Sequence, residues 1–435
     1  MNEIPKKIII INLGCSKNLV DSEQLLYHIQ ANNISTEFNP EHLQGDFAIV
    51  NTCGFINDAR EESVETILDL IQAKNAGNIG KIIVFGCLSQ RYAAELASEL
   101  PEVDCFIGNY DLEALMQELE LKADNRSVFG RTITNSGHYA YVKIAEGCNR
   151  KCSFCAIPSI KGNYISRSID SIAEEVQYLT ERGVSEIMLI AQDSSFFGYD
   201  RYKQHMLPTL LKELVSIKNL HWLRVHYLYP NAVDKQLIET IATEPKICNY
   251  YDIPFQHANT QVLKRMRRNS NQEKIIKLIN NIRSVAPDAA IRTTMIVGYP
   301  GETRSEFNDL IKFVRKIQFD RLGAFTYSHE ENTYAAKNHR DSVTTSVKKS
   351  RLNRLMTLQQ SISLEKNLSK IGKTIEVIVD EVQKDTAIGR SQYDSVEVDN
   401  EVIIENSGQL KVGNYYNVEI EMASDYELFG KVLEY

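Results

Sequence analysis

The chain has 435 residues, of which 43% are hydrophobic and 24% charged, and its net charge is −8. This length exceeds one ordinary hydrophobic core and predicts two or three domains. No run approaches the roughly 20 apolar residues of a membrane helix, and the apolar run at 8–11 is too short for a signal peptide. Eight cysteines without a secretory signal indicate the reducing cytoplasm, where thiols serve metals or catalysis. We therefore expect a cytoplasmic protein with no membrane partner.

The first part of the chain alternates apolar strands with helix-like segments. Strands are predicted at 7–13, 47–51 and 81–85, and each is followed by a helical segment, at 19–31, 58–74 and 92–100. Because such alternation is typical of a parallel sheet with right-handed crossovers, we expect an α/β domain over residues 1–122. Residues 123–138 lack periodicity and are predicted to form a linker.

The alternation resumes after this linker. Strands are predicted at 141–145, 186–191, 222–226, 250–253, 291–297 and 321–325, with helices between them and a long helix near 343–370. Six strand–helix units indicate a partial (β/α)6 barrel whose site lies at the carboxyl ends of its strands. This domain and its linking helix are expected over 139–371.

The last part of the chain, 372–435, changes to a period of two. Strands are predicted at 374–382, 386–391, 401–404 and 416–422, which suggests a small five-stranded antiparallel β-barrel. Residues 370–435 contain 6 basic and 14 acidic side chains, so the whole acidic surplus lies there. Such a module has few cations to neutralise phosphates, which disfavours nucleic acid, including DNA, as its partner.

Three cysteines fall within eight residues directly after the first strand of the central domain. They have the spacing C-x3-C-x2-C, and we call them the core triplet: Cys148, Cys152 and Cys155. Three thiolates can ligate three irons of a [4Fe–4S] cluster and leave one iron open, which can hold S-adenosylmethionine. A structural zinc ion would need a fourth ligand, and none follows at suitable spacing. Zinc or chance spacing remain the alternatives.

Three further cysteines occupy equivalent positions relative to the predicted strands. Each lies just past the carboxyl end of a predicted N-terminal strand, and we call them the strand-end triplet: Cys15, Cys53 and Cys87. Because open parallel sheets build their sites at this edge, the triplet predicts a second cluster with one open iron. The alternative is three separate buried thiols. Cys105 and Cys248 have no partner at ligand spacing and are predicted to be spectators.

The core triplet, with Phe154 before its last cysteine, resembles the radical-SAM enzymes, and the whole chain resembles the methylthiotransferases. The motifs of this resemblance are Leu-Gly-Cys-Ser-Lys-Asn-Leu-Val-Asp-Ser-Glu at 13–23, Asn-Thr-Cys-Gly-Phe-Ile at 51–56 and Phe-Gly-Cys-Leu at 85–88. The resemblance implies two [4Fe–4S] clusters, S-adenosylmethionine as cofactor, an external electron donor such as flavodoxin or ferredoxin, and a TRAM-like terminal barrel. The N-terminal cluster would hold the sulfur to be transferred, and Phe154 would pack against the adenine. A buried hydrophobe beside the loop is the alternative for Phe154, and both can hold at once.

Several stretches resemble the branch of this family that acts on a ribosomal protein. They are residues 14–22, 51–56, 251–257 and 389–394. The resemblance implies methylthiolation of the β-carbon of an aspartate in small-subunit ribosomal protein twelve, a basic substrate that suits an acidic module. The alternatives are a transfer-RNA (N6-isopentenyladenosine) methylthiotransferase and, from a different class, a non-catalytic iron–sulfur or RNA-binding protein.

Contacts with S-adenosylmethionine are predicted at the ends of the central strands. Gln192 closes the second strand, Gln256 ends the fourth, and Gly298 to Glu302 resembles the fifth-strand motif of radical-SAM barrels. A simple turn and a solvated strand end are the alternatives. The basic run at 264–268 is interpreted as a solvated helix face, and attraction of acidic substrate or cofactor groups is the alternative.

Overall fold

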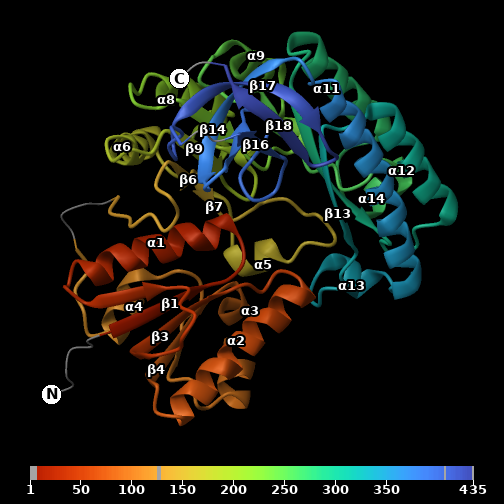
Figure 1. Ribbon diagram of the computed structural model, residues 1–435. Helices are drawn as coiled ribbons and strands as arrows, with labels where there is room; N and C mark the ends of the chain where they lie inside the picture. Colours follow the sequence, from red (N-terminus) through yellow and green to blue (C-terminus); the bar gives the residue numbers. More distant parts are fainter. Residues whose placement is uncertain (1–6, 125–128, 406–407, 434–435) are drawn as a thin grey trace. The chain divides into compact units, whose positions relative to one another are not determined.

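The structure is a computed structural model that describes residues 7–124, 129–405 and 408–433 (Figure 1). Its chain divides into two compact units. The first comprises Met1–Thr134, Glu146–Arg150 and Cys155–Tyr164, and the second comprises Asn135–Ala145, Lys151–Phe154 and Ile165–Tyr435. The domain boundaries expected from the sequence stay predictions.

The first unit is built on a five-stranded parallel sheet with the order β2-β1-β3-β4-β5. Its strands are β1 (Lys7–Asn12), β2 (Ser35–Phe38), β3 (Gly45–Thr52), β4 (Ile79–Gly86) and β5 (Cys105–Phe106). The three central strands were predicted. The polar edge strand β2, with the sequence Ser-Thr-Glu-Phe, and the two-residue β5 carry no apolar run and were missed.

Helices cover both faces of this sheet. They are α1 (Ser16–Gln30), α2 (Asn57–Asn75), α3 (Cys87–Glu99) and α4 (Leu112–Glu118), while α5 (Ile157–Lys161) packs on α3. Side chains alternate across a strand, so Ile8 and Ile10 pack with α1 and α4, whereas Ile9 packs on the other face with α2 and α3. This explains why the buried strands read as continuous apolar runs.

The second unit contains six parallel strands of the expected partial barrel. They are β6 (Tyr139–Lys143), β9 (Glu186–Ile190), β10 (Trp222–Val225), β11 (Tyr250–Asp252), β12 (Ala290–Val297) and β13 (Arg321–Thr326). They form two sheets, β10-β9-β6 and β11-β12-β13, and a bridge between Leu223 and Ile247 brings β10 beside the residues that lead into β11. The predicted (β/α)6 arrangement is confirmed.

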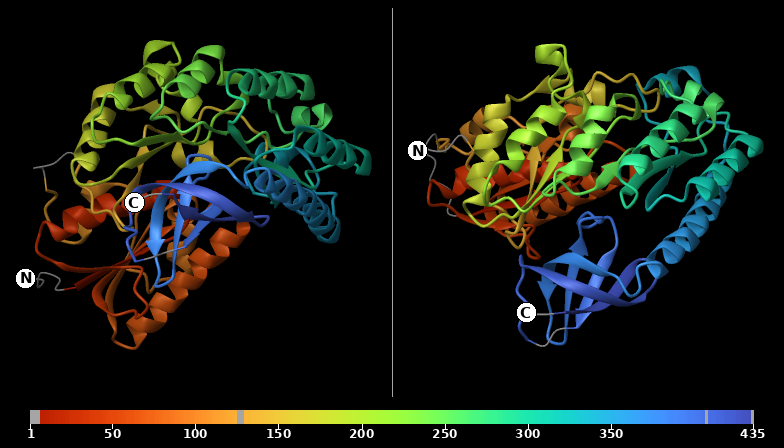
Figure 2. Two further views of the ribbon diagram at one scale, coloured as in Figure 1. Left: turned by 45° about the horizontal axis from the view of Figure 1, so that its top comes forward. Right: turned by 90° about the horizontal axis from the view of Figure 1, so that it is seen from above.

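Helices follow these strands and lead to the terminal barrel. They are α6 (Ile169–Thr180), α7 (Tyr199–Tyr202), α8 (Leu207–Val215), α9 (Lys235–Thr243), α10 (Thr260–Arg265), α11 (Gln272–Val285), α12 (Arg304–Ile317), α13 (Tyr334–Asn338) and α14 (Thr345–Leu368). The short elements are β7 (Ala145–Glu146), β8 (Ile165–Ser166), η1 (Ser194–Phe196) and η2 (Pro230–Ala232). Figure 2 shows the long α14 leading into the closed barrel.

The C-terminal strands close into a barrel with the order β14-β15-β16-β18-β17. Its strands are β14 (Thr374–Val382), β15 (Thr386–Ser391), β16 (Glu401–Glu405), β17 (Tyr415–Ala423) and β18 (Glu427–Val432). Alternate side chains such as Val377, Val379 and Ile420 fill its interior. The expected five-stranded barrel is confirmed, with two differences: its fifth strand β18 was not predicted, and β16 and β18 pair in parallel.

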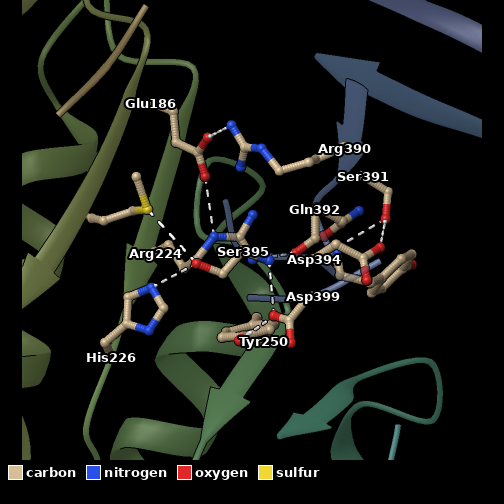
Figure 3. Close-up of polar contacts among 12 residues, drawn as sticks. Glu186, Arg224, His226, Tyr250, Arg390, Ser391, Gln392, Asp394, Ser395 and Asp399 are labelled. Carbon is tan, nitrogen blue, oxygen red and sulfur yellow. Dashed lines mark hydrogen bonds and ion pairs between the residues drawn. The ribbon is translucent and has the colours of Figure 1, made fainter. Parts of the chain in front are cut away.

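The barrel is joined to the amino ends of the core strands by buried ion pairs, which we call the barrel–core junction. Its pairs are Arg390 with Glu186, Arg321 with Asp394 and Arg292 with Asp399. Figure 3 shows Arg390 from the barrel meeting Glu186, and Glu186 also meeting Arg224 of the core. Because buried charges are tolerated only when paired, this junction fixes the barrel on the core.

No helix in the described part of the chain is long and apolar enough to cross a membrane.

Candidate metal and cofactor sites

The strand-end triplet lies at one edge of the first unit's sheet. Cys15 follows β1 as the N-cap of α1, Cys53 follows β3, and Cys87 is the first residue of α3 directly after β4. The strands β1, β3 and β4 are neighbours in the sheet and run parallel. Their carboxyl ends therefore bring the three cysteines to the same edge, as the sequence predicted.

Two glycines let the cysteine loops approach one another closely. A Cβ at Gly14 would stand 2.8 Å from the Cβ of Cys53 and 3.1 Å from its sulfur. A Cβ at Gly54 would stand 2.8 Å from the carbonyl carbon of Cys87. The 2.8 Å separation at each position is too short for any larger residue, so the loops can meet only because both positions are glycine.

The thiols of this triplet differ in burial. Cys87 is buried, Cys53 is half-buried and Cys15 is exposed. Burial raises the pKa of Cys87 to about 11 and also raises the pKa of Cys53, while Lys161 opposes the shift at each. The neighbouring thiols raise the pKa of Cys87 further, since two thiolates repel each other. A bound cation would offset this cost and release protons, so the donor set fits an iron–sulfur cluster.

Buried amides and hydroxyls hold these strand ends in place. The Asn18 side chain donates to the carbonyls of Leu13 at 3.0 Å and Thr52 at 3.1 Å. Asn51 donates to the carbonyl of Asn18 at 2.8 Å and to Ser22 at 2.9 Å. These supporting residues were missed, although the polar Asn51 inside an apolar strand was a signal that could have found it.

The predicted linker is anchored over its described part rather than free. Arg131 forms a buried ion pair with Glu23 of α1 at 2.6 Å, and the backbone N–H of Thr134 donates to the same carboxylate at 2.9 Å. Residues 125–128 of the linker lie outside the described residues. The described residues 123–124 and 129–138 form no helix or strand, and their attachment to α1 was not predicted.

The core triplet lies in the loop after β7. Cys148 is buried, and Cys152 and Cys155 are half-buried. In the described part of the chain, no three His, Cys, Asp or Glu side chains already stand together in metal-binding geometry. The donor chemistry nevertheless fits, because three thiols within eight residues supply the ligands that a cluster with one open iron requires.

The predicted cofactor contacts lie at the carboxyl ends of core strands. Gln192 follows β9 and Gln256 follows β11, where its backbone N–H donates to Thr294 at 2.8 Å. Gly298 follows β12 with φ of 77°. Phe154 packs, half-buried, against an apolar cluster that includes Tyr299, and its contact with an adenine stays a prediction.

The side chain of Glu302 contacts its own loop and two neighbouring side chains. Its buried carboxylate accepts from the backbone N–H of Gly298 and lies 3.4 Å from Arg351 and 3.7 Å from His257. These contacts fix the turn after β12, so its role toward a cofactor would be to hold Gly298 in position.

Arg268 corrects the interpretation of the basic run as a solvated face. Lys264 and Arg267 are exposed, but Arg268 is only 8% exposed, and its guanidinium donates to the sulfur of Cys152 at 3.5 Å. The sequence could not distinguish it, because the helix α10 ends at Arg265 and the chain turns at Arg267, where φ is 55°.

The acidic barrel is less acidic on its surface than its composition indicated. The side chains of Asp394 and Asp399 are 0% and 1% exposed and pair with core arginines. Asp380 pairs with Arg390 at 2.7 Å. The charge available to a partner therefore comes from other residues, including the exposed Glu401 and Glu405.

Three family models match successive parts of the chain. They are the Uncharacterized protein family UPF0004 over residues 7–108, the Radical SAM superfamily over 142–314 and the TRAM domain over 371–433.

Curated relatives match nearly the whole chain. It is 45% identical over 429 residues to the ribosomal protein uS12 methylthiotransferase RimO of Bacteroides fragilis, covering 98% of this chain and 99% of the relative. Proteins of the same name match from Bacteroides thetaiotaomicron, with 46% identity and 98% of each chain covered, and from Porphyromonas gingivalis, with 44% identity and 98% and 99% covered.

Solved structures share the fold at low identity. The radical S-adenosylmethionine methyltransferase TsrM from Kitasatospora setae, with cobalamin and a [4Fe-4S] cluster bound, matches with a TM-score of 0.55 and 12% identity, covering 74% of this chain and 75% of TsrM. The cobalamin-dependent S-adenosylmethionine radical enzyme OxsB matches with a TM-score of 0.52 and 12% identity, covering 82% and 56%. The predicted fold class is confirmed.

Proposed function

Because the chain belongs to the family of ribosomal protein uS12 methylthiotransferases RimO, we propose that it replaces a hydrogen on the β-carbon of an aspartate in uS12 with a methylthio group. uS12 is small-subunit ribosomal protein twelve. The observation that carries this proposal is the strand-end triplet, which the fold brings to one sheet edge in a chain that also contains the core triplet. A second set of three thiols can hold a second cluster, which would carry the sulfur to be transferred.

Each cysteine set has a separate role in this proposal. The core triplet holds one [4Fe–4S] cluster through three sulfurs and leaves an iron open to S-adenosylmethionine. The strand-end triplet holds the other cluster in the same way. When bound, these groups supply the sulfur, the methyl group and a carbon radical that can remove a hydrogen from an unactivated C–H bond.

Other residues would hold the cofactor and shield the reaction. Phe154 offers an aromatic face for the adenine, and Gln192 and Gln256 offer side-chain amides at the ends of β9 and β11. Gly298 brings the backbone close, with its N–H held by Glu302. Exclusion of water from this edge protects a carbon radical from quenching.

The electron donor and the location also belong to the proposal. A flavodoxin or ferredoxin would supply single electrons, because the chain's amino acids provide no low-potential donor of their own. The cytoplasm is the location proposed, since the substrate is a ribosomal protein.

Transfer-RNA methylthiolation is the less favoured alternative. The relatives described above carry the uS12 name, and the terminal barrel bears 6 basic against 14 acidic residues over 370–435. With six basic residues, of which Arg390 is buried in ion pairs, the barrel has few cations to neutralise a phosphate backbone.

The test uses anaerobically reconstituted protein and purified uS12. Wild-type protein should hold about eight irons in two clusters. Replacing the core triplet with Ala should remove about half of this iron and abolish cleavage of S-adenosylmethionine. Replacing the strand-end triplet with Ala should remove the other half and abolish methylthio-uS12, while cofactor cleavage persists.

The matched control is the double variant Cys105→Ala and Cys248→Ala. These cysteines lie outside both triplets, so iron content and product should stay at the wild-type level. Full product from the strand-end variant, or no iron loss from either triplet variant, would contradict the assignment.

A further inference from the structure

The guanidinium of Arg268 lies in a buried site beside one cysteine of the core triplet. Its Nη1 donates to the sulfur of Cys152 at 3.5 Å, and its Nη2 donates to the carbonyl of Pro254. The guanidinium carbon is 4.2 Å from the centre of the Tyr229 ring. Three different segments therefore hold this one cation against the cysteine.

The backbone keeps Arg268 and the cysteine loop in register. The N–H of Ser153, next to Cys152, donates to the carbonyl of Met266 at 3.0 Å, and the Ser153 hydroxyl donates to the carbonyl of Arg265 at 3.0 Å. The Arg268 N–H donates to the carbonyl of Leu263 at 2.9 Å. These bonds fix the backbone on both sides of the contact, and the bond to Pro254 fixes the guanidinium itself.

Arg268 forms no ion pair with a carboxylate among the described residues, although the more distant carboxylate of Asp193 also attracts it. A buried cation is costly unless an anion faces it. The group that it does face is the sulfur of Cys152, which is anionic when it ligates iron. The other buried arginines of this unit differ, since Arg321 and Arg390 each pair with a carboxylate.

We propose that Arg268 is a positioning residue for the cluster of the core triplet, where it holds the Cys152 sulfur and raises the cluster's reduction potential. The inference rests on the proposed function, because it requires that the core triplet bind the cluster. A nearby positive charge stabilises the reduced cluster, which carries one more negative charge than the oxidised cluster. Hydrogen bonds to the sulfurs and the net charge are known determinants of such potentials.

The test is a reductive titration of the full chain with dithionite, followed by electron paramagnetic resonance. Each dithionite-derived electron reduces one cluster, and no bond is made or broken in the protein. The strand-end triplet is replaced by Ala in every sample, so that the signal reports the core cluster alone. The variants are Arg268→Gln, which removes the charge but keeps a donor, and Arg268→Lys, which keeps the charge.

The matched control is Arg267→Gln. Arg267 is the adjacent arginine, it is exposed, and its guanidinium lies over Tyr334 rather than near a cysteine. At a fixed potential, Arg268→Gln should lower the ratio of reduced to oxidised cluster about tenfold, which is about 59 mV for one electron. Arg268→Lys should stay near the parent potential, and Arg267→Gln should not change it.

Two outcomes overturn the inference while leaving the proposed function intact. One is a parent-like potential in Arg268→Gln with full iron content. The other is loss of iron in both Arg268 variants, which would assign the residue to the fold. A parent protein that binds no iron at the core triplet would instead refute the proposed function.

Discussion

The ion pair between Arg321 and Asp394 should contribute strongly to the stability of the second unit. Arg321 opens the core strand β13, and Asp394 belongs to the barrel, in the segment after β15. The carboxylate is fully buried and accepts from Arg321 Nε at 2.7 Å and from the Ser391 hydroxyl at 2.7 Å. In Asp394→Asn the guanidinium loses its anion while it stays buried.

The expected cost is about 3–5 kcal/mol, the usual result of removing one partner of a buried ion pair. Domains are stable by about 5–15 kcal/mol, so this is a large fraction of the total. The matched control is Glu421→Gln, which makes the same chemical change in an exposed pair with Lys431 of the same barrel. Exposed pairs are screened by water, so the control should unfold like wild type.

The assay is urea unfolding followed by fluorescence of Trp222, the one tryptophan in the chain. This side chain is 3% exposed, its ring centre is 4.9 Å from that of Tyr415, and it packs with Ile378 of the barrel. Its emission therefore reports the barrel–core junction directly. A midpoint for Asp394→Asn equal to that of Glu421→Gln would refute the reasoning.

Three further predictions follow from the described contacts. Burial alone would raise the pKa of Asp394, but Arg321 lowers it below the usual 3.8. The stabilisation by this carboxylate should therefore be full above its unfolded pKa and be lost as the pH falls through the lower pKa of the folded state. Urea midpoints from pH 7 down to about pH 2 measure this loss, and Asp394→Asn should flatten the dependence. Gly14→Ala should cost about half of the reconstituted iron because its Cβ would meet the strand-end triplet, whereas Gly77→Ala, with a similar φ of 80° but open space around it, should keep all of it. Replacing the exposed Glu401 and Glu405 with Lys should slow association with uS12 at low salt, and added salt should shrink the difference; equal rates at low salt would show that these charges serve solubility alone.

The sequence predicted the parts of the fold that depend on local pattern. Continuous apolar runs marked the buried parallel strands, and a period of two marked the terminal barrel. It also predicted that the strand-end triplet lies at one edge of the sheet, because the carboxyl ends of neighbouring parallel strands all lie at the same edge. Short polar strands such as β2 lack an apolar signal and were missed.

Contacts between distant residues were beyond the reach of such patterns. Arg321 and Asp394 are 73 residues apart, and Arg268 and Cys152 are 116 apart. The sequence around each of the charged residues Arg321, Asp394 and Arg268 predicts a surface position, because no neighbouring residue indicates that a distant partner buries it. For the same reason the acidic composition of the barrel overstated the charge on its surface.

Mass spectrometry of uS12 shows whether this chain methylthiolates the ribosomal protein in cells. Ribosomes would be prepared from cells that lack this chain, from the same cells carrying wild-type protein, and from cells carrying the strand-end triplet variant. The account predicts one methylthio group on one aspartate of uS12 only when wild-type protein is present. Methylthiolated uS12 in cells without the chain, or unmodified uS12 together with loss of a methylthio group from transfer RNA, would contradict it.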